Sequence, residues 1–136
     1  MIKNYLIIVG VLGILAVSLG AFGAHTLASL VSEKSLSAFQ TGVQYHFYHT
    51  LAILGITQLL PHSNQPNLLK KAIHAFIVGI LLFSGSLYLL AMSNLLVSGE
   101  WNKIIGPLTP IGGIVFIIGW GILIYAGITE TKNKDE

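Results

Sequence analysis

The sequence predicts an all-α integral membrane protein, a bundle of four transmembrane helices, and three observations lead to this prediction. Apolar residues make up 54% of the 136 residues and charged residues only 9%, whereas a soluble domain has about 25% charged residues. The charges fall into five short groups, and the uncharged stretches between them cover residues 4–32, 35–69, 72–99 and 104–129. Each stretch is longer than the roughly 20 residues that a helix needs to cross a hydrocarbon core.

We expect the four spans at about residues 5–24, 37–60, 72–97 and 110–128 of a single domain, followed by a short charged tail, 131–136. Helices are expected because they satisfy their own backbone hydrogen bonds in lipid. Thr109 followed by Pro110 predicts an N-cap and a first helical residue for the fourth span. The first span has a second interpretation, a signal peptide ending near residues 21–23, but its apolar run exceeds the usual ~7 to 15 residues.

The lysines predict the orientation of these spans. With both termini in the cytoplasm, five lysines lie inside, and only Lys34 and Lys103 lie outside; the inner ones are Lys3, Lys70, Lys71, Lys132 and Lys134. This asymmetry agrees with the positive-inside rule. The lipid bilayer is therefore the first expected partner.

The composition also excludes several classes of function. The chain contains no arginine and no cluster of lysines within a span, which leaves nothing to neutralise nucleic-acid phosphates. Cysteine is absent, which excludes thiolate metal sites and thiol catalysis. No Asp or Glu lies within a span, which lowers the rank of proton- or cation-coupled carriers. We predict no resident cofactor, no metal site and no catalytic residue.

The second span is unusually polar, because residues 39–50 read FQTGVQYHFYHT. Rows of residues four apart share one side of a helix, and the wholly apolar row is that of Phe39, Val43 and Phe47. We expect this row to face lipid. That orientation points Thr41, Tyr45 and Tyr48 inward, places Gln44 and His49 beside them, and leaves His46 only about 60° from the lipid-facing row.

Polar side chains on three spans can then meet inside the bundle. An unpaired amide in hydrocarbon costs roughly 2 to 7 kcal/mol, while an interhelical hydrogen bond gains about 0.6 kcal/mol. Because the cost exceeds the gain, we expect these polar groups to serve a function. The predicted ligand-binding cluster consists of His25, Gln40, Gln44, Tyr45, His49, Ser84, Ser86 and Tyr88.

Several functions are compatible with this cluster. The leading hypothesis is a non-enzymatic membrane protein that binds a small polar group or a lipid head, and the next is an accessory or assembly subunit of a larger membrane complex. The protein partners to expect are another membrane protein or a second copy of the chain. Haem or a metal bound through His49 is a third alternative, and an intramembrane hydrolase that pairs Ser84 or Ser86 with His49 is a fourth. The same glutamines and histidine can also serve only to tie helices together.

Four motifs carry a resemblance to a known family. They are GAFGAH at residues 20–25, FQTGVQYHFYHTLAIL at 39–54, LFSGSLYLLAMS at 82–93 and TPIGGIVFIIGW at 109–120. Together they resemble the YgdD/YwdK family of small bacterial membrane proteins of unknown function. The resemblance implies four membrane helices and a location in the bacterial inner membrane, and its pattern falls on His25, Gln40, Tyr45 and His49 but not on His46. It implies no established activity.

Overall fold

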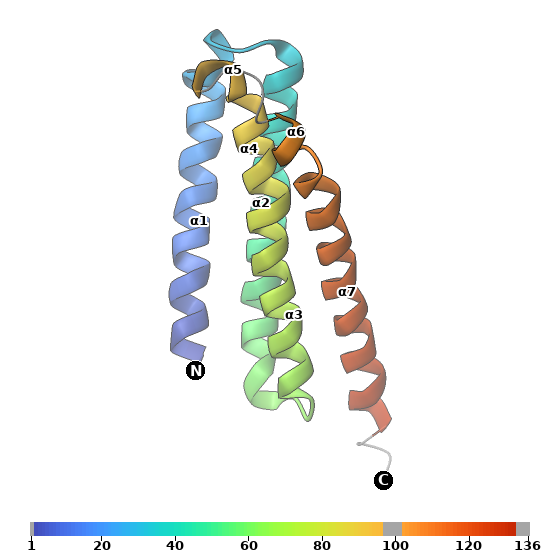
Figure 1. Ribbon diagram of the computed structural model, residues 1–136. Helices are drawn as coiled ribbons and strands as arrows, with labels where there is room; N and C mark the ends of the chain where they lie inside the picture. The colour runs from blue at the N-terminus through green and yellow to red at the C-terminus, as the bar shows by residue number, and fades with distance from the viewer. Residues whose placement is uncertain (1, 97–101, 133–136) are drawn as a thin grey trace.

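The computed structural model describes residues 2–96 and 102–132, and in these residues it contains helices and turns without strands (Figure 1). The long elements are α1 (Ile2–His25), α2 (Glu33–Leu59), α3 (Pro66–Gly79) with its continuation α4 (Gly85–Ala91), and α7 (Leu108–Lys132). A π-helix, η3 (Ile80–Ser84), joins α3 to α4. Short 3₁₀ or α-helical turns complete the chain: η1 (Leu27–Ser29), η2 (Leu60–His62), α5 (Ser93–Leu96) and α6 (Asn102–Ile105).

These elements correspond to the four predicted spans, with differences at the ends. The third predicted span extends to residue 97, which lies outside the described residues, whereas α4 ends at Ala91. Of the predicted tail, Thr131 and Lys132 belong to α7, and residues 133–136 lie outside the described part of the chain.

The helix starts follow from local side-chain chemistry. The hydroxyl of Ser32 accepts a hydrogen bond from the backbone N–H of Ser35, 3.2 Å away, and this N-cap begins α2 with Glu33 in its first turn. Pro66 opens α3, where its missing N–H costs nothing. The prediction that Thr109 caps the fourth helix was wrong, because α7 already begins at Leu108. The Thr109 hydroxyl is instead bonded to another helix, as described below.

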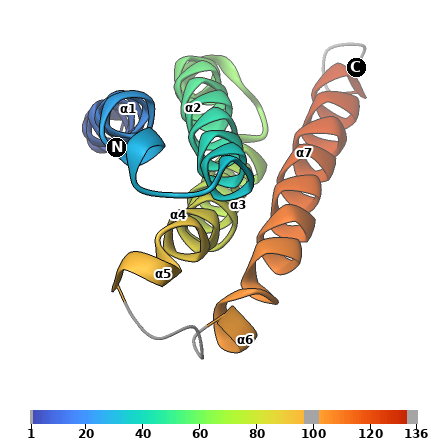
Figure 2. The same ribbon diagram turned by 90° about the horizontal axis from the view of Figure 1, so that it is seen from above.

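The long helices lie side by side, with α1 and α7 at the two outer edges (Figures 1 and 2). Helix α1 packs along α2, α2 packs along η3 and α4, and α7 packs along α3 and η3. The first turn of α1 and the last turn of α7 lie at the same end of the molecule (Figure 1). Three helical stretches are long and apolar enough to cross a membrane: Ile2–Ser29, Pro66–Ala91 and Lys103–Glu130. Helix α2 matches them in length and lies among them, but its polar residues set it apart in composition.

Glycines allow α3 and α7 to approach closely. A Cβ atom at Gly119 would lie 2.6 Å from the ring of Phe76, and one at Gly79 would lie 2.4 Å from the ring of Phe116. Each helix therefore inserts an aromatic ring opposite a glycine of the other. At Gly112 a Cβ atom would lie 2.3 Å from the backbone nitrogen of Phe83, so the two backbones themselves are in contact.

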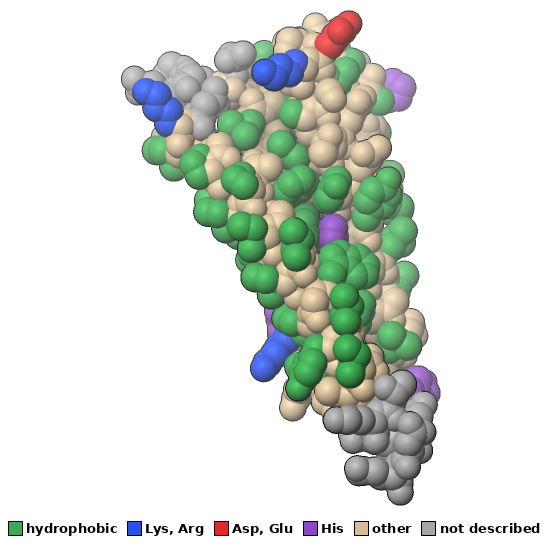
Figure 3. Space-filling view, turned by 90° about the vertical axis from the view of Figure 1, so that its right-hand side faces the viewer, with side chains coloured by type: hydrophobic (Ala, Val, Ile, Leu, Met, Phe, Trp, Pro, Cys, Tyr) green, Lys and Arg blue, Asp and Glu red, His purple; other side chains and the backbone are tan. Residues whose placement is uncertain are grey.

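The buried core continues from this contact toward the chain termini. Its largest fully buried side chains on α2 and α3 are Ile53, Ile73 and Phe76. The charged side chains visible in Figure 3 lie toward the two ends of the molecule, and the surface between them is largely apolar. This distribution is the one expected of a protein that spans a bilayer.

Candidate functional site

Helix α2 presents a different face to the outside than its apolar row predicts. Phe39, expected to face lipid, is fully buried, while Gln40 and Gln44 are exposed. Tyr45 and Tyr48, expected to point inward, are 40% and 57% exposed. The predicted orientation was therefore wrong for these residues, whereas Phe47 of the apolar row is exposed as expected.

The reason lies in the shape of the neighbouring helices. Phe39 packs against Gly23 of α1, where a Cβ atom would come within 3.0 Å of its ring, and its ring centroid is 4.9 Å from that of Tyr88. The ring of Tyr88 also packs against Gly42 of α2, where a Cβ atom would lie 2.9 Å from a ring carbon of Tyr88. A ring fills these recesses better than an amide, whose donors and acceptor would meet helix backbones already hydrogen-bonded to themselves.

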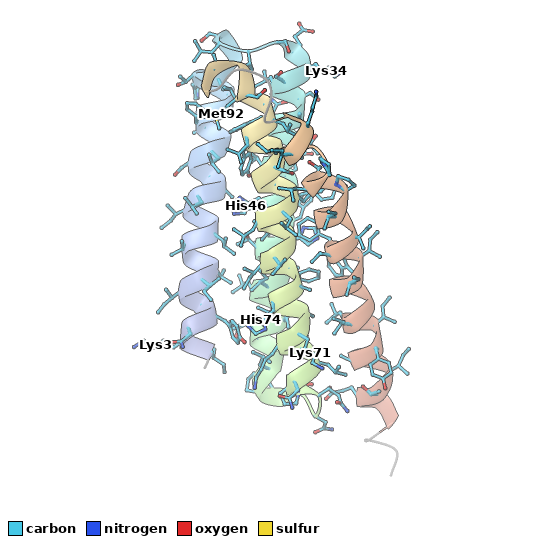
Figure 4. The ribbon with its side chains drawn as sticks, viewed as in Figure 1. Lys3, Lys34, His46, Lys71, His74 and Met92 are labelled. Atoms are coloured by element: carbon cyan, nitrogen blue, oxygen red, sulfur yellow. The ribbon has the colours of Figure 1, made fainter. Side chains whose placement is uncertain are left out.

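His46 is the second correction, because it is only 3% exposed and does not lie near lipid. Figure 4 shows it at mid-height, in the interior of the molecule. Its Nδ1 lies 3.1 Å from the hydroxyl of Tyr88 on α4, and the backbone of Leu12 on α1 lies on its other side. Among the described residues its Nε2 has no partner with hydrogen-bond geometry. His46 therefore joins α2 to α4 and faces α1.

His49 is buried as predicted, and both its ring nitrogens are engaged. The Nδ1–H donates to the carbonyl oxygen of Tyr45 over 2.7 Å, and Nε2 accepts from the indole N–H of Trp120 over 3.2 Å. Its ring stacks on Phe116 with centroids 3.5 Å apart and an interplanar angle of 11°. Phe76 contacts it edge-on, at 5.1 Å between centroids. The histidine thus stands in an aromatic enclosure that α3 and α7 supply.

These bonds fix the tautomer of His49 and occupy the lone pair that a metal or a haem iron would need. The described residues contain no group of three or more His, Asp or Glu side chains that could share a metal ion.

Of the two predicted serines, Ser84 ends the π-helix η3 and Ser86 lies in the first turn of α4, and Ser86 is the one that bonds to α7. The Ser86 hydroxyl donates to the carbonyl of Phe83 over 2.9 Å, and Thr109 lies 2.6 Å from the same hydroxyl oxygen. Since Ser86 has a single hydroxyl proton, Thr109 acts as the donor in the second bond. Ser84 is fully buried, and its hydroxyl has no partner among the described residues. Neither serine forms a hydrogen bond with His49 in the described part of the chain.

Gln40 and Gln44 line a shallow groove between α1 and α2. Its volume is about 250 Å³, and its other walls are Gly20, Gly23, Phe39 and Val43. His25 is the last residue of α1 and is exposed. A larger hollow of about 460 Å³ opens at the end where the chain termini lie, bordered by Leu59, His62, Ser63, Leu69, Leu123, Ala126, Gly127 and Glu130.

The structure therefore distributes the predicted residues over several places. Tyr45 and His49 share the aromatic enclosure, Gln40 and Gln44 share the groove, Ser86 bonds to α7, and Tyr88 bonds to His46. Sequence reasoning missed Trp120 and Phe116 as partners of His49. The signal was present, because the two rings are four residues apart on one side of the fourth span.

Comparison with known proteins gives consistent matches. A family model described as "Protein of unknown function (DUF423)" matches residues 19–113. The UPF0382 membrane protein YwdK of Bacillus subtilis is 37% identical over 126 residues, 93% of this chain and 97% of its own. A UPF0382 membrane protein of Haemophilus influenzae is 39% identical over 131 residues, 96% of this chain and 98% of its own.

A third relative, the UPF0382 inner membrane protein YgdD of Escherichia coli, is 35% identical over 129 residues, covering 95% of this chain and 92% of its own. No solved structure matches the chain.

Proposed function

The chain belongs to the DUF423 family, whose relatives are UPF0382 membrane proteins, and we propose that it acts without catalysis as a docking subunit that binds another membrane helix through the exposed glutamines of α2. One observation carries the proposal: Gln44 is exposed near the middle of a membrane-length helix.

The depth of Gln44 decides between kinds of partner. His46 is the central residue of the 27-residue α2, Glu33–Leu59, and Gln44 is two residues away, or about 3 Å along the axis. The hydrocarbon core extends about 15 Å to each side of the bilayer midplane. A lipid head stays outside this core, whereas a neighbouring helix carries hydrogen-bonding groups at any depth. An exposed amide at this level is therefore best satisfied by a protein partner.

The interior of the molecule supports a non-catalytic role. A hydrolase would need a serine activated by a histidine, but the ring nitrogens of His49 are bonded to Tyr45 and Trp120, and the Ser86 hydroxyl is bonded to Phe83 and Thr109. His49 and Ser86 are therefore engaged in structural hydrogen bonds, and His49 does not activate the Ser86 hydroxyl as a nucleophile.

The test is a native assembly measurement on the wild-type protein and two variants. After extraction in a mild detergent, the wild-type protein is expected to migrate on a native gel well above the mass of one 14.6 kDa chain. Gln44→Leu should shift most of the protein to the single-chain position. Ser18→Leu is the matched control, because Ser18 is exposed on α1 away from the groove, and it should behave as the wild type. A wild-type protein that is a single chain in native membranes, by cross-linking as well as by gel, would refute the proposal.

The groove at Gln40 favours a second candidate function, the binding of a small polar group or a lipid head. Gln40 lies six residues from the centre of α2, about 9 Å along the axis, which is closer to the membrane surface than Gln44. Native mass spectrometry of protein in lipid nanodiscs should then show a bound molecule in the wild type that is lost in Gln40→Leu. Gln44→Leu should still change the oligomeric state. Identical spectra for wild type and Gln40→Leu would exclude this candidate.

We also propose that both termini are cytoplasmic. Lys3 and Lys71 lie at the end of the molecule that carries the termini, and Lys34 lies at the opposite end (Figure 4). Alkaline phosphatase fused after residue 136 should be inactive, while a fluorescent protein fused there should fluoresce. The reverse pattern would invert the topology.

A further inference from the structure

The exposed face of α2 carries a regular seam of side chains. Its seven members, all exposed, recur every three or four residues, and we call them the glutamine seam: Ser37, Gln40, Gln44, Tyr48, Leu51, Gly55 and Gln58. The interval from Ser37 to Gln58 is 21 residues (58 − 37) in six steps, which is 3.5 residues per step. A seam of this period stays in contact with a second helix when the two wind around each other with a left-handed twist.

We propose that the occupant of this seam is a second copy of the same chain, so that the protein is a parallel, two-fold symmetric dimer whose α2 helices pair along their glutamine seams. This inference rests on the proposed function and names its partner.

The chemistry of the seam is self-complementary. A glutamine amide carries two donors on nitrogen and one acceptor oxygen, so two glutamines facing each other across a two-fold axis satisfy one another. Polar amides at such positions are known to fix the register and number of paired helices. Gly55 has no atom within 4 Å of where a Cβ would stand, and together with Ser37 it lets the two helices approach closely.

Depth matching favours a copy over an unrelated protein. Gln40 and Gln44 are four residues apart (44 − 40), about 6 Å along the axis, and both lie within 15 Å of the centre of α2. A partner must offer polar groups at both of these depths and an apolar contact at Leu51 farther along the seam. Two copies inserted in the same orientation meet this condition automatically, because each residue finds its own counterpart at the same level. A different helix would have to reproduce both spacings independently.

Among the described residues, the exposed faces of α1 and α7 lack this pattern. The exposed residues of α1 and α7 are mostly aliphatic, as at Ile14, Val17, Ile117 and Ile124, and such side chains are as well solvated by lipid tails as by protein. Lipid is a sufficient neighbour for those two edges, whereas the exposed amides of α2 need hydrogen-bond partners that lipid tails do not supply.

The absence of cysteine in the sequence permits a clean test by single-cysteine cross-linking. Leu51→Cys places one thiol within the glutamine seam, and Ile124→Cys, on the exposed face of α7, is the matched control. In membranes oxidised with copper phenanthroline, Leu51→Cys is expected to form a disulfide-linked dimer in most of the protein within minutes. The control should give at most one-fifth of that yield. Adding Gln44→Leu and Gln58→Leu to Leu51→Cys should reduce the dimer at least fivefold.

A second measurement separates this inference from the proposed function. Two copies with different affinity tags are co-expressed, and one tag is pulled down from mild detergent. Recovery of the other tag, reduced at least fivefold by Gln44→Leu, supports the dimer. If the tags do not copurify and Leu51→Cys gives no more dimer than Ile124→Cys, the dimer is refuted. If Gln44→Leu nevertheless dissolves a larger assembly on native gels, the docking role stands with a different partner, and if it does not, both proposals fail.

Discussion

The indole N–H of Trp120 on α7 donates a hydrogen bond to Nε2 of His49 on α2, with 3.2 Å between the two nitrogens. This bond crosses from the central helix to the helix at the edge of the molecule. Trp120 is 45% exposed, so its ring covers the histidine from the outside. The same side chain packs on Phe76, with ring centroids 4.9 Å apart. Trp120 thus both attaches α7 and encloses His49.

We predict that Trp120→Phe weakens this attachment. The phenyl ring keeps the contact with Phe76 but removes the donor, which leaves Nε2 of His49 without its partner. The free energy of unfolding should fall by about 1 kcal/mol, since hydrogen bonds between membrane helices contribute modestly. Steric trapping in bicelles would measure it.

A double-mutant cycle with His49→Phe isolates the bond from the packing. The coupling free energy between the two sites should be about 0.6 kcal/mol and no more than about 1.7, the average and the maximum of such bonds in a membrane protein. A coupling of zero would show that the two rings contribute independently and that the hydrogen bond adds nothing.

Glycines on α7 give a second prediction, because neighbouring positions differ sharply in their surroundings. Gly119→Ala places a methyl group 2.6 Å from the ring of Phe76, whereas the methyl of Gly121→Ala meets no atom within 4 Å. Overpacking of a tight interface costs about 1 to 3 kcal/mol, so Gly119→Ala should destabilise by that amount. Gly121→Ala should leave the stability unchanged or raise it slightly, because alanine favours the helix. Equal effects of both substitutions on thermal unfolding in detergent would contradict the interface.

Charge distribution and hydropathy were sufficient to predict the helices of this fold. Uncharged stretches between lysine groups define where lipid can surround the chain, and this condition does not depend on how the helices pack. The polar content of α2 was equally visible, and it indicated correctly that His49 is buried.

The rotation of α2 could not be obtained in the same way. Arranging residues in rows assumes that apolar side chains face lipid, but in a membrane protein the interior is apolar as well. Phe39 is buried because Gly23 and Gly42 leave room for two rings, and that room depends on the pairing of α1 with α2 and of α2 with α4. The pairing of helices is a property of the whole chain. For the same reason Thr109 was predicted to cap its own helix, whereas its hydroxyl bonds to Ser86 of α4.

The bond between His46 and Tyr88 gives a third prediction. Tyr88→Phe preserves the ring that fills the recess at Gly42 and removes only the hydroxyl, which lies 3.1 Å from Nδ1 of His46. The buried histidine then loses its hydrogen-bond partner, and we expect a loss of about 1 to 2 kcal/mol in unfolding free energy. Tyr125→Phe is the control, because Tyr125 is 58% exposed on α7. If both variants unfold at the wild-type temperature, the His46 bond is not part of the folded state.

The last prediction concerns Glu130 near the end of α7. Its carboxylate accepts hydrogen bonds from the loop between α2 and α3. One carboxylate oxygen accepts from the hydroxyl of Ser63 over 2.5 Å, and the other accepts from the backbone N–H of Asn64 over 2.8 Å. Such bonds to a charged acceptor are stronger than neutral ones, at about 1.5 to 3 kcal/mol.

Glu130→Ala should therefore speed the exchange of the Asn64 amide hydrogen by about tenfold or more, because 1.4 kcal/mol corresponds to a factor of ten. Thr129→Ala is the matched control, since within the described part of the chain the Thr129 hydroxyl bonds back to Tyr125 and Ala126 of its own helix, and exchange at Asn64 should not change. Hydrogen exchange followed by mass spectrometry on peptides covering residues 60–66 would measure both, and an unchanged rate in Glu130→Ala would show that the loop is held by other contacts.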